Sequence, residues 1–412
     1  MTPRVETSHR PRAARLAALA LLALAFAPLA AGSARASDLI TAREASWEVT
    51  EASRAAAARA LAYLASSQNR DGSWTNPIGY KRDTSYAVTL SDGNHVGVTA
   101  LAGTAFLAGG HVPEGGKYAE NVERALDYVL SRVGSDGYIS SGGDKEGTEA
   151  LVDLGTRMYS HAFATLFLAE IYGMSERTDV RHKLQLAIDF TVQCQNAQGG
   201  WRYLPFDQFS DMSVTVCQIM ALRAARNAGI RVPRENIDRA VRYVCASAVT
   251  SPGRADRGSF RYIIHDPTQG RTSFALAAAG LTTIYGSGLY TDADIRRHVT
   301  TLGVRLDHPL SIRDSVDYII RSYRNRAQLP RDHYFYFYGN YYAVQALFFR
   351  GGRDWREYYP MVRDELVSNQ SVDERSSTPV GAWPCEVGPA FTAAVGAIIL
   401  QVPYRYLPIL QR

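Results

Sequence analysis

Two kinds of apolar pattern alternate along most of the chain. In the first kind, apolar residues recur at spacings of three and four among charged residues, as expected for a helix with one face in water. We therefore predict six amphipathic helices. They cover residues 50–68, 118–133, 179–195, 235–248, 311–325 and 354–370.

The second kind of pattern is almost free of charge and is apolar around most of the helix circumference. Such a helix is expected to be buried on most sides. Many of these segments end at Gly, a frequent helix stop. They cover residues 95–110, 161–173, 211–229, 271–286, 338–352 and 388–402.

The strict alternation of the two kinds predicts an all-α fold built from six helical hairpins. An isolated hairpin cannot bury both faces of its apolar helix, whereas six hairpins in a closed ring bury all of them. We predict an α/α toroid with the apolar helices in an inner ring and the charged helices in an outer ring. It would form one domain over residues 37–412. An open solenoid of the same hairpins is the alternative topology.

A short motif recurs where a charged helix ends and an apolar helix follows. Gly supplies the positive φ that turns the chain past a helix end, and Trp covers a large apolar area. Gln can hydrogen-bond the backbone groups that a helix end leaves without partners. The motif is therefore predicted to join successive hairpins. Its copies are Gln68-x3-Gly72-x-Trp74, Gln195-x3-Gly199-x-Trp201 and, with a longer insertion, Gln370 followed by Gly381 and Trp383.

This motif at hairpin junctions resembles the QW repeat of squalene–hopene cyclases and oxidosqualene cyclases. The predicted toroid is similar to that of protein prenyltransferase β subunits, and the resemblance covers nearly all of residues 37–412. It extends to exported bacterial proteins with prenyltransferase and squalene oxidase repeats, whose C-termini resemble residues 402–412. The resemblance implies an apolar, isoprenoid-like ligand in a central cavity.

The acid motif of the cyclases is degenerate in this chain. The family carries D-x-D-D-T at the start of an inner helix, and here residues 211–215 read Asp-Met-Ser-Val-Thr. Ser213 stands where the family has its proton-donating Asp, and a hydroxyl is far too weak an acid to protonate an alkene. Triterpene cyclisation is therefore not expected. The resemblance to prenyltransferases implies a zinc site, but the chain has no matching Asp and Cys pair.

Five of the six apolar segments carry a polar residue at the predicted mouth of the ring, four positions before a Thr, Ala or Tyr. Helix N-termini converge there and favour anions. Three interpretations are open: helix N-caps without chemistry, a binding or catalytic pocket, and a metal site of His95, His161 and Asp211. In the pocket, His95 or His161 would act as acid or base, Asp211 would orient it, and Arg271 would bind an anionic group.

Residues 331–345 are rich in aromatic side chains, which suit a polyprenyl chain or stacked sugar rings. The second functional class is accordingly a toroid-fold carbohydrate-active enzyme, either a lyase or a glycosidase, which could use Asp211, Asp332, His161 and Tyr338. The third is a non-catalytic interaction scaffold. We predict no metal or other cofactor. The predicted catalytic residues are Asp211, His161 and His95, and the predicted substrate-binding residues are Arg271, Tyr338, Tyr342, His333 and Trp383.

Residues 1–36 have the pattern of a secretory signal. Arg10, Arg12 and Arg15 lead into an apolar stretch over residues 16–31, and Ala34-x-Ala36 matches a small-residue cleavage site. We predict cleavage after Ala36 and a secreted or periplasmic protein; an uncleaved membrane anchor is the alternative.

The net charge of +5 does not indicate nucleic acid as a partner. Five Arg and one Glu lie in residues 1–36, so the rest of the chain is close to +1 and carries no basic tract. We predict a monomer that binds a small molecule. The four cysteines form no C-x-x-C pair, and Cys194 and Cys245 are either a disulfide or, as we favour, buried free thiols.

Overall fold

The computed structural model describes residues 47–82, 85–142, 157–264, 270–325, 334–375 and 378–411. The chain divides into two compact units, residues 1–50 and 51–412. In the first unit only residues 47–50 are described, and they include a turn. The predicted signal segment lies outside the described residues.

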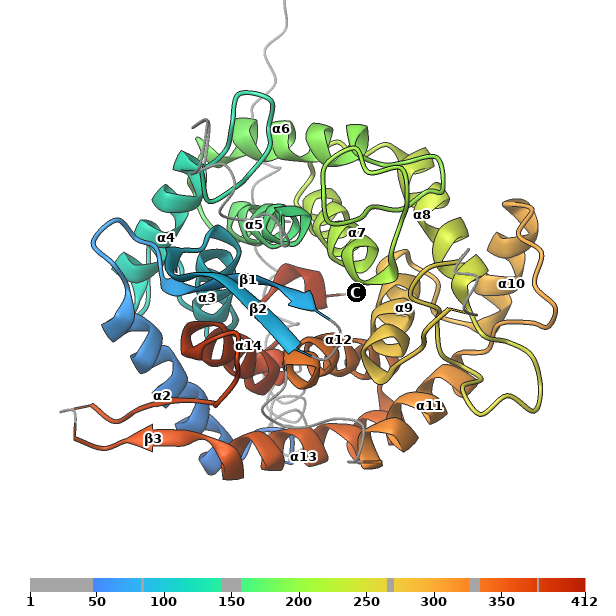
Figure 1. Ribbon diagram of the computed structural model, residues 1–412. Helices are drawn as coiled ribbons and strands as arrows, with labels where there is room; N and C mark the ends of the chain where they lie inside the picture. Colours follow the sequence, from blue (N-terminus) through green and yellow to red (C-terminus); the bar gives the residue numbers. More distant parts are fainter. Residues whose placement is uncertain are drawn as a thin grey trace, which may run out of the picture. The chain divides into compact units, whose positions relative to one another are not determined.

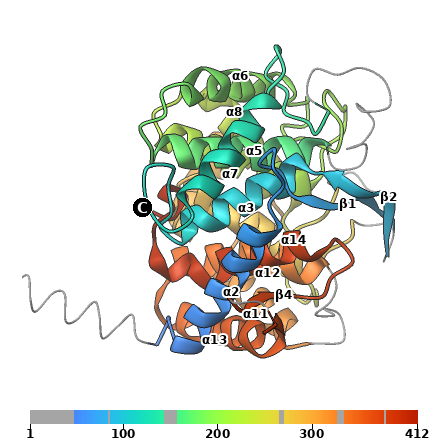
Figure 2. The same ribbon diagram turned by 90° about the vertical axis from the view of Figure 1, so that its left-hand side faces the viewer.

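Residues 51–412 fold into two concentric rings of helices (Figures 1 and 2). The inner ring consists of α3 (Val96–Ala108), α5 (Arg157–Tyr172), α7 (Met212–Asn227), α9 (Phe274–Gly286), α12 (Tyr334–Arg350) and α14 (Pro389–Gln401). The outer ring consists of α2 (Glu51–Ser67), α4 (Ala119–Ser131), α6 (Val180–Gln193), α8 (Arg234–Ser247), α11 (Ile312–Arg324) and α13 (Gly352–Asn369).

The inner ring is closed. Each inner helix packs against the next along the chain, and α14 packs back against α3 as well as against α2. This last contact excludes an open solenoid. The predicted all-α fold, an α/α toroid of six helical hairpins, is therefore confirmed, and the apolar helices do form the inner ring. Every residue of α3 and of α9 is buried, as their charge-free sequences predict.

Several smaller elements decorate the ring. An antiparallel hairpin, β1 (Thr75–Arg82) and β2 (Ser85–Asn94), connects α2 to α3. A second one, β3 (Ser371–Asp373) and β4 (Val380–Ala382), connects α13 to α14. Neither hairpin was predicted from the sequence, and nor was α10 (Asp292–Thr301), which lies outside the rings beside α8 (Figure 1).

The two faces of the ring differ. The inner helices begin at the face that carries β1 and β2, and the chain ends at the opposite face (Figure 2). There two short 3₁₀ turns, η3 (Val402–Tyr404) and η4 (Pro408–Leu410), pack against the inner helices α7, α12 and α14. We call the face at which the inner helices begin the mouth.

The recurring Gln-Gly-Trp motif joins neighbouring hairpins as predicted. The side-chain amide of Gln68 donates to the carbonyl of Gly72 (3.0 Å) and to that of Asn121 (2.9 Å) in α4. Gly72 has a φ of +89°, and a Cβ there would collide with the carbonyl of Arg124. The indole of Trp74 donates back to Leu64 in α2 (2.9 Å).

The same contacts recur at two other joints. Gln195 donates to the carbonyls of Gly199 (2.7 Å) and of Asn236 (2.8 Å) in α8. Gln370, in the last copy, donates to the carbonyl of Ala56 in α2 (2.9 Å) and accepts from Arg59 (2.8 Å). The last copy therefore joins the sixth hairpin to the first and helps to close the ring.

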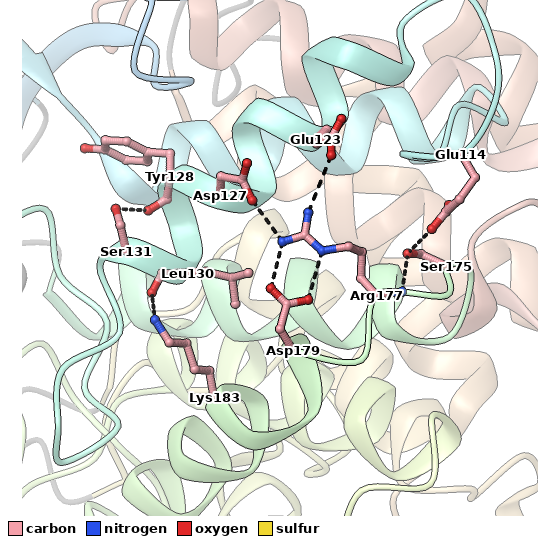
Figure 3. Close-up of polar contacts among 10 residues, drawn as sticks. All are labelled: Glu114, Glu123, Asp127, Tyr128, Leu130, Ser131, Ser175, Arg177, Asp179 and Lys183. Carbon is pink, nitrogen blue, oxygen red and sulfur yellow. Dashed lines mark hydrogen bonds and ion pairs between the residues drawn. The ribbon is translucent and has the colours of Figure 1, made fainter.

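A charged cluster reinforces the outer ring between α4 and α6 (Figure 3). The Arg177 guanidinium binds Asp127 of α4 (2.9 Å) and Asp179 (2.7 Å), with Glu123 3.9 Å away. Lys183 of α6 donates to the carbonyl of Leu130 at the end of α4 (2.6 Å). These contacts cross between two hairpins and fix their relative position.

Cys194 and Cys245 are buried free thiols, so the two do not form a disulfide with each other. Within the described ranges, no helix is both long and apolar enough to cross a membrane.

Candidate functional site

Asp211 is the central residue of the mouth. It precedes α7 as its N-cap: its carboxylate Oδ1 accepts from the backbone N–H of Val214 (2.9 Å) and from the hydroxyl of Ser213 (2.6 Å). The residue is fully buried, yet its second oxygen, Oδ2, has no hydrogen-bond partner among the described residues. A buried carboxylate oxygen without a partner is costly and calls for a functional explanation.

Burial raises the pKa of Asp211 to about 6. Desolvation is the dominant cause, because it disfavours the charged carboxylate. The hydrogen bonds from Ser213 and Val214 and the positive charge of Arg202 oppose this rise. Asp211 can therefore gain or lose a proton near neutral pH, which a general acid or base needs.

A chain of hydrogen bonds connects Asp211 to a partly exposed tyrosine. The hydroxyl of Tyr159, in α5, donates to Ser213 Oγ (2.6 Å), and Ser213 Oγ donates to Asp211 Oδ1 (2.6 Å). Tyr159 is half-buried, whereas Asp211 is inaccessible. Ser213 thus links a buried carboxyl group of raised pKa to the hydroxyl of a half-buried tyrosine.

Two loop tyrosines complete this cluster. The carbonyl of Tyr203 accepts from the N–H of Met158 at the start of α5 (3.1 Å), and that of Tyr262 accepts from Met212 at the start of α7 (2.9 Å). Their backbones therefore satisfy the free N–H groups of two inner helices. The hydroxyls of Tyr203 and Tyr262 hydrogen-bond to each other, and the ring of Tyr203 lies 6.0 Å from that of Tyr159.

Each loop tyrosine lies under an arginine. The Arg271 guanidinium lies 4.8 Å from the centre of the Tyr262 ring, and that of Arg202 lies 5.9 Å from the centre of the Tyr203 ring. The predicted residue Arg271 is therefore at the mouth. Arg202 was not predicted.

Aromatic side chains cross the centre of the ring just below the mouth. The inner helices α5 and α12 lie opposite each other, yet Tyr159 is 6.5 Å from Tyr338 and Phe163 is 6.0 Å from Tyr341, measured between ring centres. Tyr338 also donates to the carbonyl of Ser213 in α7 (2.8 Å). These contacts bring aromatic side chains of opposite inner helices together near the axis of the ring.

The two predicted substrate-binding residues of α12, Tyr338 and Tyr342, therefore have different surroundings. Tyr338 is half-buried and belongs to the Asp211 cluster. Tyr342 is fully buried, and its hydroxyl lies 3.0 Å from the thiol of Cys217, so its contacts are those of a packed core residue. His333 and Asp332 lie outside the described residues.

His161 does not join the cluster. It is fully buried; its Nδ1 accepts from the N–H of Ile139 (3.2 Å), and its Nε2 lies 2.8 Å from Thr191 Oγ1 in α6. Thr191 in turn donates to the carbonyl of Ala187 (2.9 Å), so the imidazole donates from Nε2. Burial lowers the pKa of His161 to about 3, and the neutral ring links α5 to α6. The acid–base role predicted for it does not fit these contacts.

His95 is the N-cap of α3. Its Nδ1 accepts from the N–H groups of Gly97 (3.2 Å) and Val98 (3.4 Å), and the residue is buried. These contacts match the interpretation of the mouth residues as caps. In the part of the chain that the structure describes, no three His, Cys, Asp or Glu side chains gather closely enough to hold a metal ion. His95, His161 and Asp211 thus do not form the metal site considered above.

Trp383 lies elsewhere. It is buried, and its indole donates to the carbonyl of Leu366 (2.8 Å) as in the other copies of the motif. It borders a cavity of about 150 Å³ that shares no residue with the Asp211 cluster. The lining residues are Tyr336, Phe337, Glu365, Leu366, Asn369, Trp383 and Pro384.

Four residues of the cluster were not predicted from the sequence: Tyr159, Tyr203, Tyr262 and Arg202. A signal for the loop tyrosines was present, because each lies two residues after the aromatic residue that follows a motif glycine. The sequence reads Trp201-x-Tyr203 in the third repeat and Phe260-x-Tyr262 in the fourth. Comparing positions just beyond the motif would have identified the pair.

No protein-family model and no curated protein matches this chain. A sugar epimerase from a ruminal bacterium has a similar structure, with a TM-score of 0.49 and 13% sequence identity over 88% of this chain and 98% of the epimerase. The type II terpene cyclase MstE from Scytonema, in its apo form, has a TM-score of 0.32 and 14% identity over 87% of this chain and all of the cyclase. Likenesses this distant carry no argument about activity.

Proposed function

We propose that the protein binds a compact small molecule at the mouth of the ring and carries out acid–base chemistry on it. The observation that carries this proposal is the hydrogen-bond chain from Tyr159 through Ser213 to Asp211. It joins the hydroxyl of the half-buried Tyr159 to a buried carboxyl group whose pKa, at about 6, is close to neutral pH.

The chain is oriented for proton abstraction. Tyr159 donates to Ser213, and Ser213 donates to Asp211, so each hydroxyl proton already points towards the carboxylate. When a ligand hydroxyl or an acidic C–H gives its proton to Tyr159, Tyr159 passes its own to Ser213 and Ser213 passes its own to Asp211. One proton leaves the ligand, and Asp211 ends neutral, as its raised pKa favours.

Tyrosine hydroxyls and arginines around the cluster favour a hydroxylated ring, such as a sugar, over an extended chain. The contacts of Tyr159 with Tyr338 and of Phe163 with Tyr341 place aromatic rings near the axis, where a sugar ring could stack on them. The carbohydrate-active alternative is therefore our first choice for ligand class. The apolar, isoprenoid-like ligand is the second candidate, because Phe163 and Phe391 leave partly exposed aromatic surface on the inner helices.

The proposal is tested with molecules that co-purify with the protein, identified by mass spectrometry and then offered back as substrates. We expect Tyr159→Phe to keep ligand binding and to lose turnover about 100-fold or more, as for a general base. Asp211→Asn should lose turnover as well. Tyr318→Phe on the outer helix α11 is the matched control and should match the wild type. Unimpaired turnover in both Tyr159→Phe and Asp211→Asn would refute the acid–base role.

Export and monomeric state are further parts of this proposal. The charge and apolar pattern of residues 1–36 support a cleaved signal. The mass of the exported protein should correspond to a chain that begins at Ser37, and light scattering should give the mass of one chain. A full-length mass in the membrane fraction would instead support the anchor.

A further inference from the structure

We infer that the ligand of the mouth carries an oxyanion, a carboxylate or a phosphate, which Arg202 and Arg271 bind together. This inference rests on the proposed function, because it concerns the same site. Neither guanidinium makes a hydrogen bond or an ion pair with any described residue. Arg271 is exposed and Arg202 is half-buried, so both can be reached.

The tyrosine pair holds the two arginines on one platform. Arg202 lies over Tyr203, Arg271 lies over Tyr262, and the two tyrosine hydroxyls are hydrogen-bonded. Burial raises the pKa of Tyr203, and the positive charges of both arginines oppose that rise. A guanidinium stacked on an aromatic face keeps its N–H groups directed outwards in the plane, where they match an oxyanion.

The helix arrangement adds to the positive potential. Arg271 lies two residues before Ser273, the N-cap of α9, and Arg202 lies in the loop that leads into α7. The N-terminal ends of helices attract anions. The local carboxyl group, Asp211, forms no ion pair with Arg202, and its Oδ2 is buried without a partner among the described residues. The arginines are thus not neutralised by Asp211.

The neighbouring tyrosines point to the second group of the ligand. A hydroxyl group next to the oxyanion would lie beside Tyr159, whose ring is 6.0 Å from that of Tyr203. A sugar acid or a sugar phosphate has both groups on one small ring, which fits the compact site. The carboxylate and the phosphate share the chemistry that two guanidinium groups recognise, and binding experiments separate them.

We would titrate the full-length protein with sodium D-glucuronate, with inorganic phosphate and with D-glucose at constant ionic strength, and measure heats by calorimetry. We expect saturable binding of at least one anion and weaker binding of glucose. Arg202→Gln and Arg271→Gln should each weaken anion binding about tenfold or more. Arg181→Gln, which removes an exposed arginine from the outer helix α6, is the matched control and should bind as the wild type does.

Each pattern of anion binding leads to a different conclusion about the ligand. Binding of glucuronate alone assigns a carboxylate, and binding of phosphate alone assigns a phosphate. The inference is overturned if neither anion binds. It is also overturned if Arg202→Gln and Arg271→Gln bind the anion as tightly as the control Arg181→Gln does. Its failure is distinct from that of the proposed function: anion binding that depends on both arginines, together with full turnover in both Tyr159→Phe and Asp211→Asn, would refute only the acid–base role.

Discussion

The hydroxyl of Ser213 donates a 2.6 Å hydrogen bond to the carboxylate of Asp211 and accepts one of the same length from Tyr159. In the proposed function, Ser213 would pass a proton between these two groups, which are not hydrogen-bonded to each other. Asp211, which was predicted to orient a histidine, would then be the proton acceptor.

Stability should fall with rising pH because of Asp211. Its pKa is raised from 3.8 to about 6 on folding, so its stabilising contribution is present below pH 3.8 and is lost as the pH rises through 6. Asp211→Asn keeps the shape and the cap acceptor but cannot ionise. We expect the variant to gain about 2–3 kcal/mol over the wild type between pH 4 and pH 7. Urea unfolding across this range is the measurement.

The exposed Asp189→Asn change in α6 is the control and should leave the pH profile as it is. If the free energy of unfolding of Asp211→Asn changed with pH in the same way as that of the wild type, Asp211 would not titrate as described.

Glu170 should make the opposite face of the ring sensitive to pH. This buried carboxyl group of α5 accepts from the N–H of Ile409 in η4 (3.2 Å), and burial raises its pKa from 4.5 to about 8. Its contribution is present below pH 4.5 and is lost as the pH rises through 8. Glu170→Gln should remove this dependence, worth about 3–5 kcal/mol over the full range.

Hydrogen exchange of residues 407–411 gives a local readout. We expect faster exchange above pH 8 in the wild type than in Glu170→Gln, because the ionised carboxylate is poorly solvated beside η4. Glu235→Gln, at an exposed position in α8, is the control. Exchange rates that do not differ between wild type and Glu170→Gln at high pH would contradict this role.

We expect any side chain at Gly72, in the joint between the first and second hairpins, to destabilise the protein. Alanine there would combine the strain of a φ of +89° with a collision between its Cβ and the carbonyl of Arg124 in α4. Gly253 has a φ of +82°, but a Cβ added to it would meet no atom of the described residues within 4 Å. We expect Gly253→Ala to lose about 1 kcal/mol from strain alone and Gly72→Ala to lose about 3 kcal/mol or more. Thermal and urea unfolding of the two variants, compared directly, would show equal losses if the close approach to α4 were unimportant.

Much of the fold could be predicted from local patterns in the sequence. The charge-free sequence of α9 and the three–four spacing of apolar residues in α11 assign these helices to the inner and outer rings without any tertiary information. The hairpin of β1 and β2 was not predicted, although Tyr86, Val88 and Leu90 alternate along β2 as expected for a strand. Asp211 was found because a carboxylate before an apolar helix is a recognisable cap.

The sequence by itself determined which segments form the helices of the two rings, which of them are buried, and where Gly and Trp join them, because periodicity, capping and turn conformation are local properties of the chain. Only the tertiary structure decided which polar groups meet. Tyr159, Asp211 and Tyr338 belong to three hairpins far apart in sequence, and closure of the ring brings them together. His161 was aligned with Asp211 as a mouth residue, yet it packs against α6, because the direction of a side chain depends on how its helix is rotated against its neighbours.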